Sequence, residues 1–167
     1  MAVWIIDDGP LDQLALTLPP LATASWPKGR FVVAEATRTA AKGKRKELLD
    51  GSPDTFDTCE IKVGSAAFHV LYGHLRLPWG PVANAAEYQA IAWAIAQRQD
   101  AILVTLDKRA AMLGLAELGK GRVAHAFDLW LHLRDAGLVT KEQFTALCEA
   151  TKRSDQALPG IPLRCSP

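Results

Sequence analysis

The sequence predicts an α/β fold, a three-layer α/β/α sandwich around a mostly parallel central sheet. Short apolar runs of the kind that form buried parallel strands recur along the chain, most clearly at 3–6 and 100–106. Longer segments with helical signals separate these runs. Strands that are joined through helices lie parallel, with right-handed crossovers, so the alternation favours this class over an all-helical or antiparallel fold.

The strands are placed by the apolar runs and by the turn residues that end them. The first run stops at Gly9-Pro10, and Pro is favoured as the first residue of a helix. A weaker run around Cys59 alternates enough to be a strand. The predicted strands are 3–6, 30–34, 58–63, 100–106 and 122–124.

The helices are placed by apolar periodicity together with start and stop residues. Pro19-Pro20 ends the first helix, Asn84 is placed to cap a long Ala-rich helix, and Gly137 separates the last two. The predicted helices are 10–18, 35–49, 65–75, 84–99, 107–118, 125–136 and 140–151.

Length and composition indicate one globular domain. The chain has 167 residues, 49% of them hydrophobic, which is enough to bury a core. We expect a domain over 1–153 and a Pro-rich, frayed or draped tail over 154–167. The formal net charge is only +1, so affinity for nucleic acid would have to come from a local patch.

Cysteine usage and hydropathy predict a cytoplasmic protein that does not enter a membrane. Three widely spaced cysteines neither build a disulfide framework nor match a zinc pattern, which favours a reducing compartment. No apolar run approaches the ~20 residues of a membrane span. The N-terminus has no basic segment ahead of an apolar one, so no signal peptide is expected.

Three acidic residues stand where an apolar stretch gives way to a helix signal. Asp7 follows the first strand, Asp107 follows the strand 100–106, and Glu87 opens the Ala-rich helix. The carboxyl ends of parallel strands meet at one edge of a sheet, where these carboxylates would repel one another without a cation. Hard oxygen ligands select Mg²⁺ or Mn²⁺, and such an ion activates water against a phosphodiester.

Each acid has a simpler explanation when it is taken alone. Asp107 precedes Lys108-Arg109-Ala110, and Glu87 lies in the first turn after Asn84, so either side chain can satisfy amides at a helix N-terminus. For a single acid, capping is the better interpretation. The three together, in this order, favour a shared site.

The order and surroundings of the acids resemble the PIN-domain family of metal-dependent ribonucleases, which includes the toxins of bacterial toxin–antitoxin pairs. Ile-Ile-Asp-Asp-Gly-Pro-Leu at 5–11 is similar to the family's first strand and first acid. Ala-Glu-Tyr-Gln-Ala-Ile-Ala at 86–92 resembles its Gly-Glu-x-Glu-Ala-Ile-Ala helix start. Residues 103–110 resemble the strand that delivers its late Asp, and Gly-Leu-Val at 137–139 its late turn.

This resemblance implies a PIN-like fold and Mg²⁺- or Mn²⁺-dependent cleavage of RNA. It implies that Asp7, Glu87 and Asp107 are catalytic and bind metal, with Glu35 as the closest candidate for an additional acidic ligand. Family habit further implies an antitoxin protein as partner and a homodimer. Asp8, Ala86 and Gln89 depart from the family pattern, so a degenerate, non-catalytic PIN-fold module that binds protein or nucleic acid stays open.

The first strand and its acids also resemble the start of a receiver domain, a Mg²⁺-binding signalling module. That fold needs an apolar strand that ends in the phosphoacceptor. Asp54 and Asp57 instead lie in a Ser-Pro-Asp-Thr-Phe-Asp loop with no such strand before them. The receiver domain is therefore the more remote alternative.

Basic and aromatic residues supply candidates for substrate contact. Lys44 and Arg45 belong to the densest basic cluster, which by default is a solvated helix face. Lys108 and Arg109, next to the predicted metal site, are better placed for phosphate. Of the tryptophans, we expect Trp26 and Trp79, each beside Pro in a loop, to be exposed, and the remaining ones to be buried: Trp4, Trp93 and Trp130.

Overall fold

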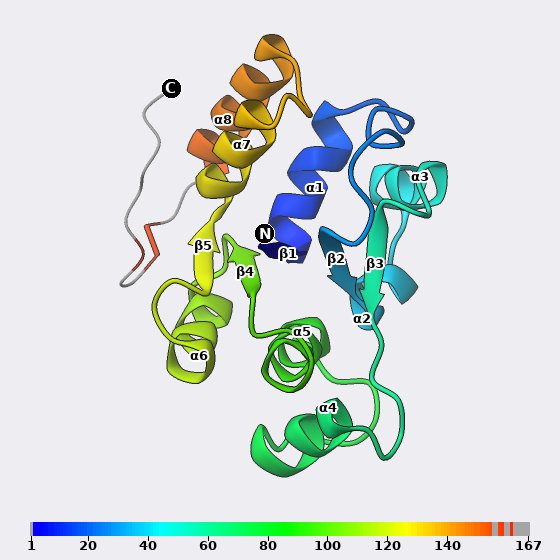
Figure 1. Ribbon diagram of the computed structural model, residues 1–167, viewed down its shortest axis with the longest axis vertical. Helices are drawn as coiled ribbons and strands as arrows, with labels where there is room; N and C mark the ends of the chain where they lie inside the picture. Colours follow the sequence, from blue (N-terminus) through cyan, green and yellow to red (C-terminus); the bar gives the residue numbers. More distant parts are fainter. Residues whose placement is uncertain (1, 155–156, 159–160, 162–167) are drawn as a thin grey trace.

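The computed structural model describes residues 2–154, 157–158 and 161. Five parallel strands form one sheet in the order β3-β2-β1-β4-β5, with helices on both faces (Figure 1). The predicted three-layer α/β/α class is confirmed, and every strand pair of the sheet is parallel. No helix in the described ranges combines the length and apolar character that a membrane crossing requires.

The strands are short and mostly buried. Their bounds are β1 Val3–Ile6, β2 Phe31–Ala34, β3 Phe56–Cys59, β4 Ala101–Thr105 and β5 Val123–His125. Four of them lie within one or two residues of the prediction. The strand predicted at 58–63 ends at Cys59, and its partner β2 ends opposite at Ala34, so no paired neighbour extends it further.

Alternating side chains of β1 serve two different cores. Trp4 and Ile6 face the larger core, which contains residues of α1 (Asp8–Thr17), α7 (Ala126–Asp135) and α8 (Lys141–Ser154). Val3 and Ile5 face the second core against α5 (Ala85–Ala96). The continuous apolar run of β1 is thus explained by burial on both faces of the sheet.

The remaining helices are α2 Glu35–Thr39, α3 Gly43–Gly51, α4 Ala66–His69, the π-helix η1 Val70–His74 and α6 Lys108–Leu118. The single helix predicted at 35–49 is wrong. The chain leaves α2 at Ala40, Lys42 is extended, and Gly43 has a φ of 55°, a left-handed conformation that a glycine adopts without strain. Two helices therefore follow β2.

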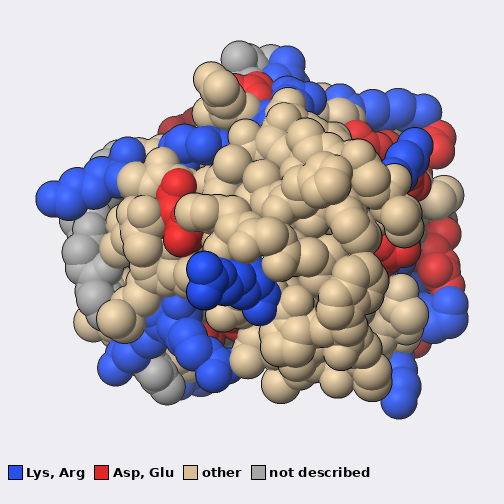
Figure 2. Space-filling view, turned by 90° about the horizontal axis from the view of Figure 1, so that it is seen from below, with Lys and Arg blue, Asp and Glu red and all other residues tan. Residues whose placement is uncertain are grey.

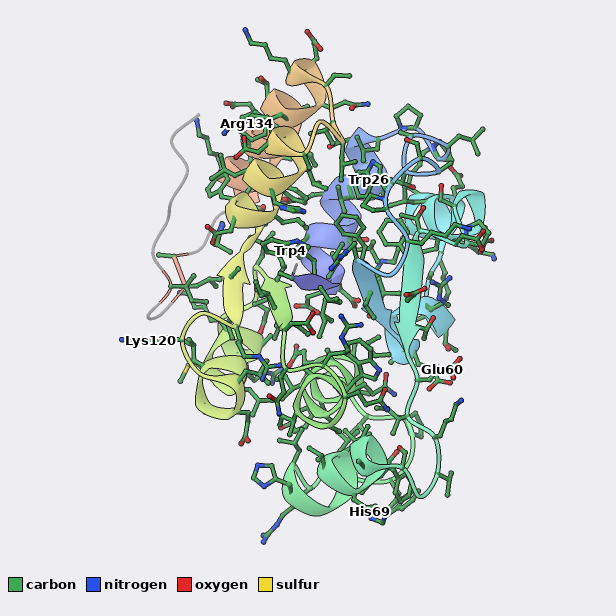
Figure 3. The ribbon with its side chains drawn as sticks, viewed as in Figure 1. Trp4, Trp26, Glu60, His69, Lys120 and Arg134 are labelled. Atoms are coloured by element: carbon green, nitrogen blue, oxygen red, sulfur yellow. The ribbon has the colours of Figure 1, made fainter. Side chains whose placement is uncertain are left out.

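Trp26 is buried, contrary to the expectation that it would be exposed. Its ring packs on Phe31 with centroids 4.9 Å apart, and its Nε1 donates to the carbonyl of Leu138 at 3.0 Å. Figure 3 shows Trp26 and Trp4 within the layers of the molecule. Trp79 is 74% exposed, as expected, and stacks on Tyr72.

Two residues of the predicted tail belong to the packed structure. Leu158 and Ile161 are buried in a small cluster with Ala111 of α6 and Val123 of β5. Ser154, where the tail was expected to begin, is the last residue of α8. Residues 155–156, 159–160 and 162–167 lie outside the described part of the chain.

Candidate active site

The site lies where the sheet changes its direction of growth. From β1 the chain moves to β2 on one side, and only later to β4 on the other side of β1. The connections after β1 and β4 therefore diverge and leave a crevice beyond the carboxyl ends of these strands. Asp7 follows β1, and Asp107 follows β4 after Leu106, so both aspartates are delivered to this crevice.

A cavity of about 500 Å³ occupies the crevice. Its walls come from the start of α1, the inner face of α2, the start of α5, the end of β4 and the end of α8. Four carboxylates line it: Asp7, Asp8, Glu87 and Asp107. The three acids predicted from the sequence are thus brought together, and Asp8 joins them.

Asp7 is the most constrained of these acids. Its Oδ2 accepts a 2.6 Å hydrogen bond from the Thr105 hydroxyl, and its side chain makes no capping bond to α1. Burial raises the pKa of the Asp7 carboxyl, the Thr105 hydrogen bond acts against that rise, and the charges of Asp8 and Asp107 add to it. The helix cap is therefore not the role of this side chain.

Glu87 faces the same cavity from the first turn of α5. Burial and the neighbouring charges of Asp7 and Asp107 raise its pKa to about 7, which the nearby Arg109 only partly offsets. Its Oε2 is buried and has no hydrogen-bond partner among the described residues. Such an atom is unfavourable in a folded protein unless something else satisfies it.

Asp107 combines both interpretations that the sequence left open. Its Oδ1 accepts a 2.8 Å hydrogen bond from the backbone amide of Ala110 and so caps α6. The residue is exposed and lines the cavity. A carboxylate that caps a helix with one oxygen retains a second oxygen, so Asp107 can cap α6 and bind a cation at the same time.

Asp8 is held by two side chains. Its Oδ1 accepts a 2.6 Å hydrogen bond from the Thr37 hydroxyl and lies 3.3 Å from Nη1 of Arg45. Asp8 departs from the family pattern in sequence, yet it adds a carboxylate to the cavity wall. The sequence did not identify it as a site residue.

Glu35 is not brought into the cavity. It is exposed and lines a separate hollow with Thr39, Glu60 and other residues. The cavity is instead lined by Ala36, Thr37 and Ala40, the opposite face of the short helix α2. The helix places the predicted acid and the cavity on different sides.

The donor set fits a hard divalent cation, although the ligand shell is incomplete. Within the described ranges no three His, Cys, Asp or Glu side chains form a ready metal site. The cavity nevertheless gathers carboxylate oxygens, which Mg²⁺ and Mn²⁺ prefer, and it includes the unpartnered Oε2 of Glu87. A cation bound there would satisfy this oxygen and lower the raised pKa values of Asp7 and Glu87.

The four basic residues predicted to contact substrate fall into two pairs. Lys44 pairs with Glu47 at 3.0 Å, and Arg45 donates to both oxygens of Asp12 at 2.8 and 2.9 Å. These two are engaged in the protein's own ion pairs. Lys108 and Arg109 are exposed at the start of α6, directly after Asp107.

Charge on the surface is local rather than general. Figure 2 views the molecule from the end that carries α4 and shows a broad uncharged area, with Lys or Arg side chains near the middle of the view and further charged residues around the edge. This pattern agrees with the formal net charge of +1. Attraction for phosphate would therefore have to come from a cation bound in the cavity and from single basic side chains near it.

Sequence reasoning missed three polar residues that organise the site. Thr105 and Thr37 donate to Asp7 and Asp8, and the Gln89 Oε1 accepts from the Ala36 amide at 2.9 Å, which ties α5 to α2. Thr105 had a signal, because it is a polar residue at the end of an apolar strand and two residues before Asp107. No signal in the sequence indicates Thr37 or Gln89, because their hydrogen-bond partners are distant in sequence.

No protein-family model, no curated protein and no solved structure matches this chain.

Proposed function

We propose that the protein is a Mg²⁺- or Mn²⁺-dependent ribonuclease of the PIN type. The observation that carries the proposal is the convergence of Asp7, Glu87 and Asp107, from three different elements, on one cavity at the carboxyl edge of the sheet. The choice of RNA as substrate comes from the resemblance of the sequence motifs to that family. An antitoxin partner and a homodimer are proposed on the same ground, and a cytoplasmic location is proposed from the cysteine usage of the chain.

The surroundings of each residue indicate its role in metal binding or in substrate contact. When bound, the metal would acidify a water molecule and stabilise the charge that develops on an attacked phosphodiester. Asp7, oriented by Thr105, and Asp107, oriented by its cap on α6, would hold the metal. Glu87 would add its buried, unpartnered Oε2 to the metal ligands, and the cation would lower its raised pKa and keep this carboxylate charged. Lys108 and Arg109 would contact substrate phosphates.

The test is cleavage of a labelled RNA by the purified protein with Mn²⁺, with Mg²⁺, or with EDTA. We expect cleavage only with metal, and a loss of at least about 100-fold in the Asp7→Asn and Asp107→Asn variants. Asp135→Asn, the same change at an exposed site at the end of α7, should cleave as the wild type does. Metal-dependent cleavage that survives in Asp7→Asn would refute the assignment.

One observation favours the second candidate, a non-catalytic PIN-fold binding module. Gln89 stands where the family motif has a second acid, and its side chain is used to hold the Ala36 amide. A position that once supplied a carboxylate would then have become structural. Saturable Mn²⁺ binding by the wild type, lost in Asp7→Asn, without cleavage of any RNA offered would support this candidate instead.

A further inference from the structure

A second hollow adjoins the acidic cavity. It lies between α5 and α6 and has a volume of about 420 Å³. Asn84 and Glu87 line both spaces, so the two hollows share a wall. The volume is within the range of pockets that hold small organic molecules. Whatever occupies the acidic cavity can therefore extend into this second hollow.

The lining of the second hollow differs from that of its neighbour. Lys108 and Arg109 bring two positive charges, and Tyr88, Met112 and Leu113 bring apolar surface. Met112 is 60% exposed, which is a large apolar exposure on a helix that also begins with two cations. Apolar side chains next to cations match a ligand that has a flat apolar part and a negatively charged part.

The guanidinium of Arg109 is fixed relative to the acids, and Lys108 precedes it on the same helix turn. Lys108 and Arg109 form the first turn of α6, whose N-terminus is capped by Asp107. The Arg109 guanidinium also donates to Oδ1 of Asn84 on the opposite wall. The charge of Arg109 is therefore held next to the acidic cavity by its place on α6 and by its hydrogen bond to Asn84.

We propose that this hollow binds the nucleotide next to the cleaved phosphate of a single-stranded nucleic acid. The base would lie against Tyr88 and Met112, and its phosphate would meet Lys108 and Arg109. The inference rests on the proposed nuclease function, which places a phosphodiester in the adjoining cavity. A base can enter such a hollow only when it is unpaired, so the substrate is single-stranded.

An acidic protein segment would meet the same two cations. The shared wall favours the nucleic acid, because a phosphodiester chain can place one phosphate at the metal and the next at Lys108 and Arg109. A carboxylate segment gives the apolar part of the hollow no flat partner. The two occupants are separated by the test, which asks whether binding depends on a base.

The first measurement is binding of labelled oligoribonucleotides to the Asp7→Asn protein, which retains the hollow. Three ligands are compared: a single strand, the same strand in a duplex, and a single strand that carries abasic residues. We expect the unmodified single strand to bind at least about fivefold more tightly than either of the others, since a stacked base contributes that much or more. Equal binding of all three overturns the proposal.

The second measurement compares surface variants in binding and in cleavage. Met112→Glu adds a negative charge to the hollow without removing a buried side chain, and should weaken binding and raise KM by about tenfold or more. Lys108→Ala should do so to a smaller extent. Lys120→Ala is the matched control, because Lys120 is exposed, lines neither hollow and points away from the molecule in Figure 3.

Failure of this inference and failure of the nuclease proposal look different. If RNA is cleaved but Met112→Glu has an unchanged KM, the hollow is not a nucleotide site while the nuclease stands. If no RNA is cleaved but single strands bind in a base- and Met112-dependent manner, the hollow is confirmed and the catalytic proposal fails. A polyglutamate peptide that binds as tightly as the single strand and competes with it assigns the hollow to an acidic partner instead.

Discussion

The Thr105 hydroxyl donates a 2.6 Å hydrogen bond to Oδ2 of Asp7. The hydroxyl oxygen of Thr105 in turn accepts a 2.9 Å hydrogen bond from the backbone amide of Asp107. One side chain at the end of β4 thus links the two aspartates that the sequence predicted as partners. Its geometry fixes which Asp7 oxygen stays available to a cation.

Loss of the Thr105 hydroxyl should therefore affect both the stability of the protein and metal binding at the site. Thr105→Val keeps the volume but leaves Asp7 without its donor, so we expect the free energy of unfolding to fall by about 1–3 kcal/mol. It should also raise the pKa of Asp7 further and weaken Mn²⁺ binding by about 10- to 100-fold. Urea denaturation and Mn²⁺ titration measure the two effects. Thr105→Ser, which keeps the hydroxyl, should behave as the wild type.

Stability without divalent cations should fall as pH rises from about 4.5 to about 7. Burial and the neighbouring acids raise the pKa of Glu87 to about 7, and burial raises that of Asp7. In this window these two carboxyls hold more protons in the folded protein than in the unfolded chain, so their deprotonation favours unfolding, while the lowered pKa of His132 acts in the opposite direction. The thermal midpoint in EDTA should be higher at pH 5 than at pH 8, and Glu87→Gln should reduce the difference.

Divalent cations should reverse this trend. Protons compete with the metal for the same carboxylates, so Mn²⁺ should raise the thermal midpoint more at pH 8 than at pH 5. The matched measurement uses Asp7→Asn, in which the gain at pH 8 should be small. A midpoint that is independent of both pH and Mn²⁺ would show that the acidic cavity does not hold a cation.

Asn84 has two separable roles. Its backbone is left-handed, with a φ of 68°, and its side-chain oxygen accepts from Arg109. Asn84→Ala removes the amide and also strains the backbone, at a cost of about 1–2 kcal/mol. Asn84→Gly removes the amide alone. Both variants should raise KM for RNA alike, whereas only Asn84→Ala should lose stability in urea denaturation.

Gly114 sets how closely α6 approaches the sheet. A Cβ at this position would lie 2.9 Å from Val123 Cγ2 and 3.1 Å from Leu103 Cδ2. Gly114→Ala should therefore lower the free energy of unfolding by about 1–2 kcal/mol, although alanine favours a helix. Gly73 has open space around it, so Gly73→Ala should be neutral or stabilising in the same denaturation series.

The sequence was sufficient for features that depend on local signals. Continuous apolar runs identified β1 and β4, and the parallel arrangement placed Asp7 and Asp107 at one edge. Glu87 followed from the helix start at Asn84. These predictions needed no knowledge of which distant residues pack together.

Other features depend on contacts between residues far apart in the chain. The direction of Glu35 depends on how α2 docks, which in turn depends on the bond between Gln89 and the Ala36 amide. The burial of Trp26 depends on the carbonyl of Leu138, 112 residues later. Neither contact leaves a periodic or compositional signal, so neither could be predicted.

The buried pair Leu158 and Ile161 has a consequence for α6, the helix that begins with Lys108 and Arg109. Both side chains pack against Ala111 and Val123. Ala111 lies three residues after Lys108 on α6. A protease that cuts after α8 would release this apolar anchor and loosen the helix that presents both cations. Loss of these two residues would then weaken the proposed binding of single-stranded nucleic acid, although neither residue would touch the ligand.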